Sequence, residues 1–204
     1  AQDMAGSLAV SPLADSTWPV PASVLRVPLH ATTYAESTTL VCAWAERGEA
    51  RYVCAANVHM VMEARDDPAF WEIVNAADLV TPDGMPLVWI LRRKGFPLKD
   101  RVYGPTLMRW VLAEAAKRGI PVGLLGGTPG VLAALARNVQ AEFPELQVAF
   151  QHSPPFRPLS ADEDRALVRK INASGARILF VGLGCAKQVR WMATHAARTE
   201  DPIQ

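Results

Sequence analysis

The sequence predicts an α/β protein with a single domain, in which helices cover both faces of a parallel sheet. Two observations support this fold class. From residue 50 onward, short β-rich runs alternate with helical patterns, which is typical of βαβ units. The chain has 204 residues, of which 50% are hydrophobic and 20% charged, so it can bury one sizeable core.

In the first part of this pattern, strands and helices follow one another closely. The predicted strands are 51–56 and 78–82, and the predicted helices are 58–66, 68–76 and 85–95. In the last of these helices, Leu87, Ile90 and Leu91 lie on one side, and the basic end "RRK" suits a helix C-terminus.

The second part continues the alternation. The predicted strands are 120–127, 146–150 and 177–184, and the predicted helices are 106–119, the segment that ends before Pro144, and 161–175. We expect Ser160 and Glu163 to form a capping box. Helical spacing predicts that the apolar residues of these helices are buried, among them Leu107, Trp110, Val111, Ala115, Val131, Leu132, Leu135, Val139, Phe143, Leu167, Val168 and Ile171.

The start of the chain differs in composition from the rest. Residues 1–23 are rich in Ala, Ser and Pro and lack the pattern of a signal peptide, so we expect a loosely ordered arm before a domain at 24–204. No apolar run approaches the ~20 residues of a membrane-spanning helix. Three distant cysteines without a CxxC pair indicate a reducing, cytoplasmic setting. A net charge of +1 gives no general attraction to nucleic acid.

Ligands of open parallel sheets bind outside the carboxyl ends of the strands. Four places qualify: Asn57, Asp83, "GGTPG" at 126–130 and "GLGCAKQ" at 182–188. We expect all four on one edge of the sheet.

Asp83 and Asn57 each allow two interpretations. An Asp beside Gly at a strand end is commonly a turn residue or an N-cap, but in a site-forming loop it is also suited to act as a general base. Asn57 is either a helix cap or a group that orients a sugar or base.

The two glycine-containing loops are weaker signals. The backbone amides of Gly126 and Gly127 could face a diphosphate at the start of a helix, although the loop lacks the GxGxxG spacing and Pro129 could simply open the helix. The loop with Gly184 is not a P-loop, yet Lys187 and Gln188 could reach a phosphate and a sugar. No metal site is expected, because the histidines form no ligand pattern and no DxD pair is present.

Several motifs in the same order resemble the WecG/TagA/CpsF family of bacterial glycosyltransferases. They are "NVHMVMEA", "ADLVTPDGMPLVW", "RVYGPTLM", "LLGGTPGVL", "FPELQV" and "ILFVGLGCAKQVRW", and the resemblance runs from about Val24 to Trp191. It implies a Rossmann-like fold and metal-independent, inverting transfer of a sugar, N-acetylmannosamine above all, from a UDP-sugar. The implied acceptor is a polyprenyl-diphosphate-linked saccharide in cell-surface polysaccharide synthesis, at the inner face of the cell membrane. No cofactor is implied, and a homo-oligomer is compatible.

The resemblance also implies roles for individual residues. Asp83 matches the proposed base, Asn57 a substrate-contacting asparagine and Arg101 an arginine suited to phosphate. Gln188 matches the glutamine of the family's "PKQE" motif, and the glycines of "LLGGTPG" fall in the nucleotide site.

The sequence departs from the family pattern at several positions. Ala55 stands where a threonine is common, and Ala186 and Val189 replace the proline and the acid of "PKQE". The basic C-terminal appendage that binds the membrane is expected to be missing, so the predicted domain is C-terminally shortened. These departures favour the alternative of a weakly active or non-catalytic UDP-binding module. A Rossmann oxidoreductase ranks last, because the NAD fingerprint is absent.

Overall fold

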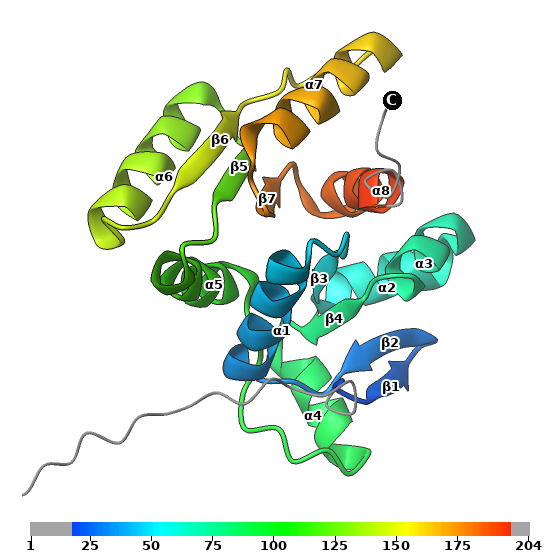
Figure 1. Ribbon diagram of the computed structural model, residues 1–204. Coiled ribbons are helices and arrows are strands. Elements are labelled where there is room, and N and C mark those ends of the chain that lie inside the picture. Colours follow the sequence, from blue (N-terminus) through cyan, green and yellow to red (C-terminus); the bar gives the residue numbers. More distant parts are fainter. Residues whose placement is uncertain (1–17, 197–204) are drawn as a thin grey trace, which may run out of the picture.

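The computed structural model describes residues 18–196 (Figure 1). In chain order the elements are β1 (Pro21–Val24), β2 (Val27–His30), α1 (Tyr34–Arg47), β3 (Val53–Ala56), α2 (Val58–Asp66), α3 (Pro68–Asn75), β4 (Leu79–Pro82), α4 (Met85–Arg93), α5 (Gly104–Arg118), β5 (Val122–Gly126), α6 (Pro129–Glu142), β6 (Val148–His152), α7 (Ala161–Ser174), β7 (Ile178–Gly182) and α8 (Cys185–Ala196).

Parallel strands with helices around them confirm the predicted α/β class. Their arrangement differs from the expected single sheet, because the parallel strands form two hydrogen-bonded sheets. In one sheet β3 pairs with β4, with Ala56 opposite Pro82. In the other, β5 lies between β6 and β7, with Gly126 opposite Gly182. The four predicted site loops are therefore divided between two sheet edges.

Each parallel sheet has its own hydrophobic core. The first core surrounds β3 and β4 and includes the fully buried Phe70, Val80 and Leu91 from α3, β4 and α4. The second core surrounds β5 and includes Leu112 of α5 and Val139 of α6. The two clusters explain why periodic apolar positions occur along the whole chain although no single sheet collects them.

Three helices connect the two halves (Figure 1). Leu40 and Trp44 of α1 pack on Leu79 of β4, while the guanidinium of Arg177, just before β7, donates to the carbonyl of Ala45 at 3.1 Å. Helix α8 follows β7, yet its Val189 is buried in the first core. Helix α5 leads from the β4 side into β5. The halves therefore form one packed structure.

The N-terminal part of the described chain was not predicted in detail. Strand β1 begins at Pro21, before residue 24, where the sequence predicts the domain to begin, and it pairs antiparallel with β2. Thr33 and Glu36 form a capping box that opens α1. Residues 1–17 and 197–204, which include most of the predicted arm, lie outside the described residues.

Strand β2 is joined to β4 by a histidine side chain. The buried imidazole of His30 accepts a hydrogen bond from the Val80 amide through Nδ1, at 2.9 Å. Burial lowers the pKa of His30, more than the nearby Asp78 carboxylate raises it. A neutral ring is required for this bond, since a protonated Nδ1 cannot accept.

Helix boundaries agree with the sequence predictions within a few residues, but some burial predictions are wrong. The Ser160–Glu163 capping box at α7 is confirmed. By contrast, Trp110 and Val131 are exposed, at 47% and 62%. Helical spacing tells which residues share a face, whereas the neighbouring elements decide how wide a strip is covered. Here Trp110 stacks on the Tyr34 ring at the surface, with ring centroids 5.8 Å apart.

Candidate functional site

Two predicted site residues lie side by side at the carboxyl ends of β3 and β4. Asn57 follows Ala56, and Asp83 follows Pro82, its strand partner. The Asp83 amide donates to the Ala56 carbonyl at 2.8 Å, which extends the strand pairing by one residue. The loops that carry Asn57 and Asp83 therefore leave the sheet together.

The Asp83 carboxylate contacts the start of a distant helix. Its Oδ2 accepts a hydrogen bond from the amide of Gly104, the first residue of α5, at 3.2 Å. The N-cap of α4, the helix that follows Asp83, is Gly84, and no side chain caps it. Asp83 is therefore not the N-cap of its own helix. It binds one of the free amides at the α5 N-terminus, where a negative charge is favoured.

Gly104 lies close to Ala55 and to the Asp83 carboxylate. A Cβ at this position would lie 3.4 Å from the Ala55 Cβ and 3.7 Å from Asp83 Oδ2. A Cβ at position 104 would thus make only ordinary van der Waals contacts, and Ala55, one of the departures from the family pattern, faces Gly104 beside the carboxylate. Gly104 was not singled out from the sequence, although the "GP" pair, with proline early in a helix, marks a helix start and hence free amides.

The environment of Asp83 shifts the pKa of its carboxyl group. Burial raises the pKa of the Asp83 carboxyl, while the Gly104 amide and the positive charge of Arg101 act in the opposite direction. Arg101 is itself exposed, and its guanidinium lies over the Tyr103 ring, 4.8 Å from the centroid. A half-buried carboxylate with a raised pKa and a cation nearby can accept a proton from a bound hydroxyl.

Asn57 fits the helix-cap interpretation. It is the N-cap of α2, and its Oδ1 accepts a hydrogen bond from the Met60 amide at 2.9 Å. The residue is exposed, and the NH₂ group of its side chain has no hydrogen-bond partner within residues 18–196. The cap fixes the side chain with its NH₂ group free for a ligand, so the two predicted roles of Asn57 are compatible.

The "GGTPG" loop is built by a close approach of two strands. Gly126 has φ +124°, and a Cβ there would lie 2.2 Å from the carbonyl oxygen of Gly182. The Gly127 amide donates to that same oxygen at 3.2 Å. Packing alone therefore requires glycine at position 126. Thr128 caps α6 through the Val131 amide, and Pro129 is the first residue of the helix, as the structural interpretation predicts.

The loop after β7 leads into α8 beside the first sheet. Gly184 has φ +95°, a conformation that favours glycine, and its carbonyl accepts from the Gln188 amide at 2.8 Å. Cys185 packs against the first core, the one that contains Ala56 at the end of β3. Helix α8 thus brings the second sheet's loop to the first sheet. Lys187 is exposed and Gln188 half-buried, and neither contacts Asp83 or Asn57 through a hydrogen bond in the described part of the chain.

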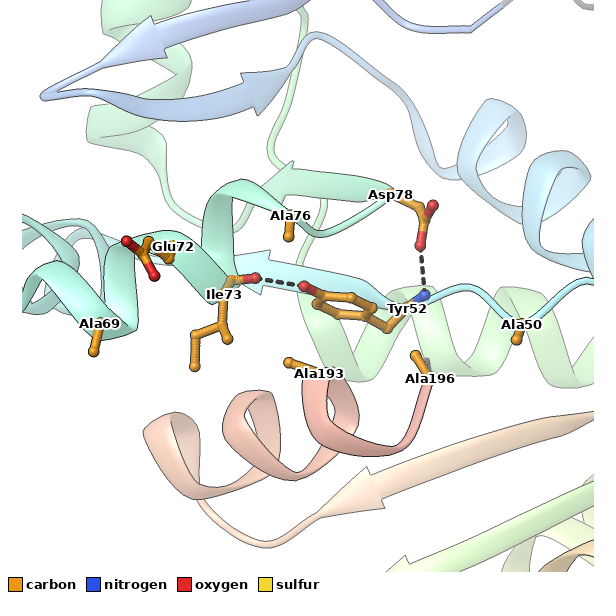
Figure 2. A pocket seen from close by; sticks show the side chains of 9 residues that line it. All are labelled: Ala50, Tyr52, Ala69, Glu72, Ile73, Ala76, Asp78, Ala193 and Ala196. Atoms are coloured by element: carbon orange, nitrogen blue, oxygen red, sulfur yellow. Dashed lines mark hydrogen bonds between the residues drawn. The ribbon is translucent and has the colours of Figure 1, made fainter. Parts of the chain in front are cut away.

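A cavity of about 520 Å³ lies at the other end of β3 and β4, between α3 and α8 (Figure 2). Of its polar lining residues, Tyr52 and Asp78 are hydrogen-bonded within the protein, and Glu72 is exposed. The Asp78 carboxylate accepts from the Tyr52 amide at 2.9 Å and from Arg51 at 2.8 Å, and the Tyr52 hydroxyl donates to the Ile73 carbonyl at 2.6 Å. Burial raises the pKa of Tyr52 to about 12. These satisfied groups at the amino ends of the strands indicate packing, so we place the candidate site at the carboxyl ends.

The fold and these loops define an α/β protein whose candidate site lies at the carboxyl ends of parallel strands. Residues 22–204 match the glycosyl transferase WecG/TagA/CpsF family, and the chain belongs to this family. It is accordingly a glycosyltransferase domain of cell-surface polysaccharide synthesis. Among the described helices, none has the length and apolar character needed to cross a membrane.

Proposed function

We propose that this glycosyltransferase transfers a sugar from a UDP-sugar to a polyprenyl-diphosphate-linked saccharide, and that the favoured sugar is N-acetylmannosamine. The observation that carries the proposal is the half-buried Asp83 carboxylate at the end of β4, bound to the α5 N-terminus and next to the positive charge of Arg101. The membrane-linked acceptor implies work at the inner face of the cell membrane.

The proposed reaction is a direct displacement with inversion. The acceptor hydroxyl gives its proton to Asp83, and its oxygen attacks the anomeric carbon of the donor. The bond between that carbon and the diphosphate oxygen breaks, and UDP leaves. Oδ1 is suited to receive the proton, because Oδ2 already accepts from the Gly104 amide.

Stabilisation of the leaving diphosphate falls to cations and backbone amides in place of a metal ion. Arg101 is exposed on the Asp83 side, and Lys187 is exposed in the first turn of α8. Helix N-termini add partial positive charge at the same edges. The free NH₂ group of Asn57 is placed to donate to the donor or acceptor sugar.

The test is transfer from radiolabelled UDP-N-acetylmannosamine to a lipid-linked N-acetylglucosamine acceptor. Asp83→Asn removes the base and keeps the shape, so we expect the rate to fall by about 10²–10⁴-fold with UDP binding unchanged by calorimetry. Asp162→Asn, at an exposed site on α7, is the matched control and should keep full activity. An Asp83→Asn enzyme as fast as the wild type would rule out the base assignment.

A UDP-binding module with weak or no activity is the second candidate, and one observation favours it. Val189, which replaces the acid of the family motif, is buried in the first core and cannot serve the site. The module predicts UDP binding without transfer in the same pair of measurements. Transfer that depends on Asp83 excludes it.

A further inference from the structure

Helix α4 exposes an apolar stripe. Pro86, Trp89, Ile90 and Arg93 are exposed and follow the spacing i, i+3, i+4, i+7, so they share one outer face, here named the α4 face. Trp89 is 56% exposed and Ile90 37%. The opposite side of the helix is buried in the first core through Leu87, Val88 and Leu91. Trp89 and Ile90 thus form a small exposed apolar patch on the outer side of α4.

The basic residues of this region are concentrated after the apolar stripe. Residues 92–101 hold five basic side chains and one acidic side chain, a net charge of +4 in a chain whose total is +1. Within residues 18–196, none of these five forms an ion pair. We name residues 92–101 the basic segment.

The basic segment is folded back onto the end of α4. The Arg92 guanidinium donates to the carbonyls of Leu98 and Lys99, at 2.6 and 2.5 Å. Arg93, Lys94 and Lys99 are exposed around this closed turn. The cations are therefore held next to the α4 face, and Figure 1 shows this helix and its loop at the periphery of the molecule, away from α6 and α7.

We propose that the α4 face and the basic segment together dock on an anionic membrane surface. Tryptophan is favoured at the membrane–water interface, and an apolar helix face flanked by Lys and Arg binds there when the lipids are anionic. A net charge of +4 whose cations form no ion pair within residues 18–196 favours this partner over an apolar protein surface. The inference rests on the proposed function, because a lipid-linked acceptor requires the site to lie near the membrane.

The position of α4 connects docking to the candidate site. The helix begins at Met85, immediately after Asp83 and Gly84, and the basic segment ends at Arg101, whose charge acts on Asp83. Docking through this region would set the Asp83 carboxylate at a fixed height above the lipid headgroups. It would also place the cations beside the diphosphate of a lipid-linked acceptor.

The test is flotation of the full chain with vesicles of phosphatidylcholine, with or without phosphatidylglycerol. We expect binding only to the anionic vesicles, and its loss at high salt. Trp89→Ser/Ile90→Ser should weaken binding roughly tenfold. Arg93→Gln/Lys94→Gln/Lys99→Gln should weaken it on the order of a hundredfold.

Matched controls separate the α4 face from general effects. Trp110→Ser removes an exposed tryptophan from α5, and Arg137→Gln/Arg169→Gln/Lys170→Gln removes three exposed cations from α6 and α7. Both should bind anionic vesicles like the wild type. UDP binding, measured by calorimetry without lipid, should be unchanged in every variant, so loss of docking is distinguishable from failure of the proposed function.

Three outcomes would overturn the proposal. The first is no binding of the wild type to anionic vesicles. The second is equal weakening by the α4 and control variants. The third is a dimer in light scattering that Trp89→Ser/Ile90→Ser converts to a monomer without any vesicle binding, which would assign the α4 face to a second copy of the chain.

Discussion

The two parallel sheets present different chemistry at their carboxyl edges. The edge of β3 and β4 presents side chains, Asn57 and Asp83, each held by a hydrogen bond to a helix N-terminus. The edge of β5 and β7 presents backbone, with Gly126 and Gly127 packed against the Gly182 carbonyl. The first edge is suited to move a proton, whereas at the second edge the Gly127 amide is already bound to the Gly182 carbonyl. Substitutions at the edge of β5 and β7 should therefore reduce folding stability, and substitutions at the edge of β3 and β4 should mainly reduce activity.

The largest effect on folding is expected at the backbone edge. Gly126→Ala places a methyl group 2.2 Å from the Gly182 oxygen at a φ of +124°, so we expect it to destabilise the fold by about 3 kcal/mol or more. Urea unfolding measures this change. Gly130→Ala is the control, because a Cβ there meets nothing within 4 Å, and its effect should stay below ~1 kcal/mol. Equal stability of the two variants would contradict the close approach.

A smaller effect is expected at Asn57, where cap and ligand roles can be separated. Asn57→Ala removes the cap on α2 and should cost about 1 kcal/mol of folding stability. Asn57→Asp keeps a good cap and should preserve stability, but it loses the NH₂ donor and adds a negative charge near the diphosphate. We expect transfer to drop in Asn57→Asp, measured beside its urea unfolding curve. Full activity in this variant would leave Asn57 with a structural role only.

The smallest effect is a shift in pH dependence at the side-chain edge. A general base works when deprotonated, so kcat/KM should rise with pH through the raised pKa of Asp83. Arg101 opposes that rise in pKa, so Arg101→Gln should move the acid limb to higher pH, in addition to slowing transfer through the lost charge beside the diphosphate. Arg169→Gln on α7 should leave the limb in place.

The pKa of Asp83 also predicts how the free energy of unfolding should change with pH. Because the pKa of Asp83 is raised in the folded protein, its ionised form costs stability at higher pH, and this cost is relieved as pH falls through the folded pKa. Asp83→Asn should remove that contribution. For the pH profile of kcat/KM, an acid limb that stays in place in Arg101→Gln would contradict the effect of the Arg101 charge on the pKa of Asp83.

The sequence predicted most elements from residue 51 onward, because their periodicity, caps and glycine stops are local. Pairing is not local. The separation into two sheets depends on contacts such as Gly126 with Gly182, and the Asp83–Gly104 bond joins the end of β4 to the start of α5, whose spacing in the sequence carries no signal. The predicted places of Asn57 and Asp83 after strands are confirmed, while their catalytic roles stay predictions.

The exposed tryptophans show the limit of periodicity. Trp110 was assigned to a buried face because it has helical spacing with Leu107 and Val111, and it is nevertheless 47% exposed. Val131 on α6 shows the same error, since it is 62% exposed. Both residues lie at the margin of the apolar strip of their helix. The element that packs on the helix decides whether this margin is buried, and the width of that element is not written in the helix's own sequence.

The His30–Val80 hydrogen bond has a consequence for association between molecules. An unpaired amide on the edge of a sheet is a template for a strand from another chain, and long exposed edges promote aggregation. On β4 the Val80 amide is already occupied by an imidazole, and the β1–β2 hairpin lies over that side. A lowered pKa keeps the ring able to accept as the solution becomes mildly acidic. The histidine thus pairs this edge amide within the molecule, and because Val80 is fully buried the amide is not available to a strand of another chain.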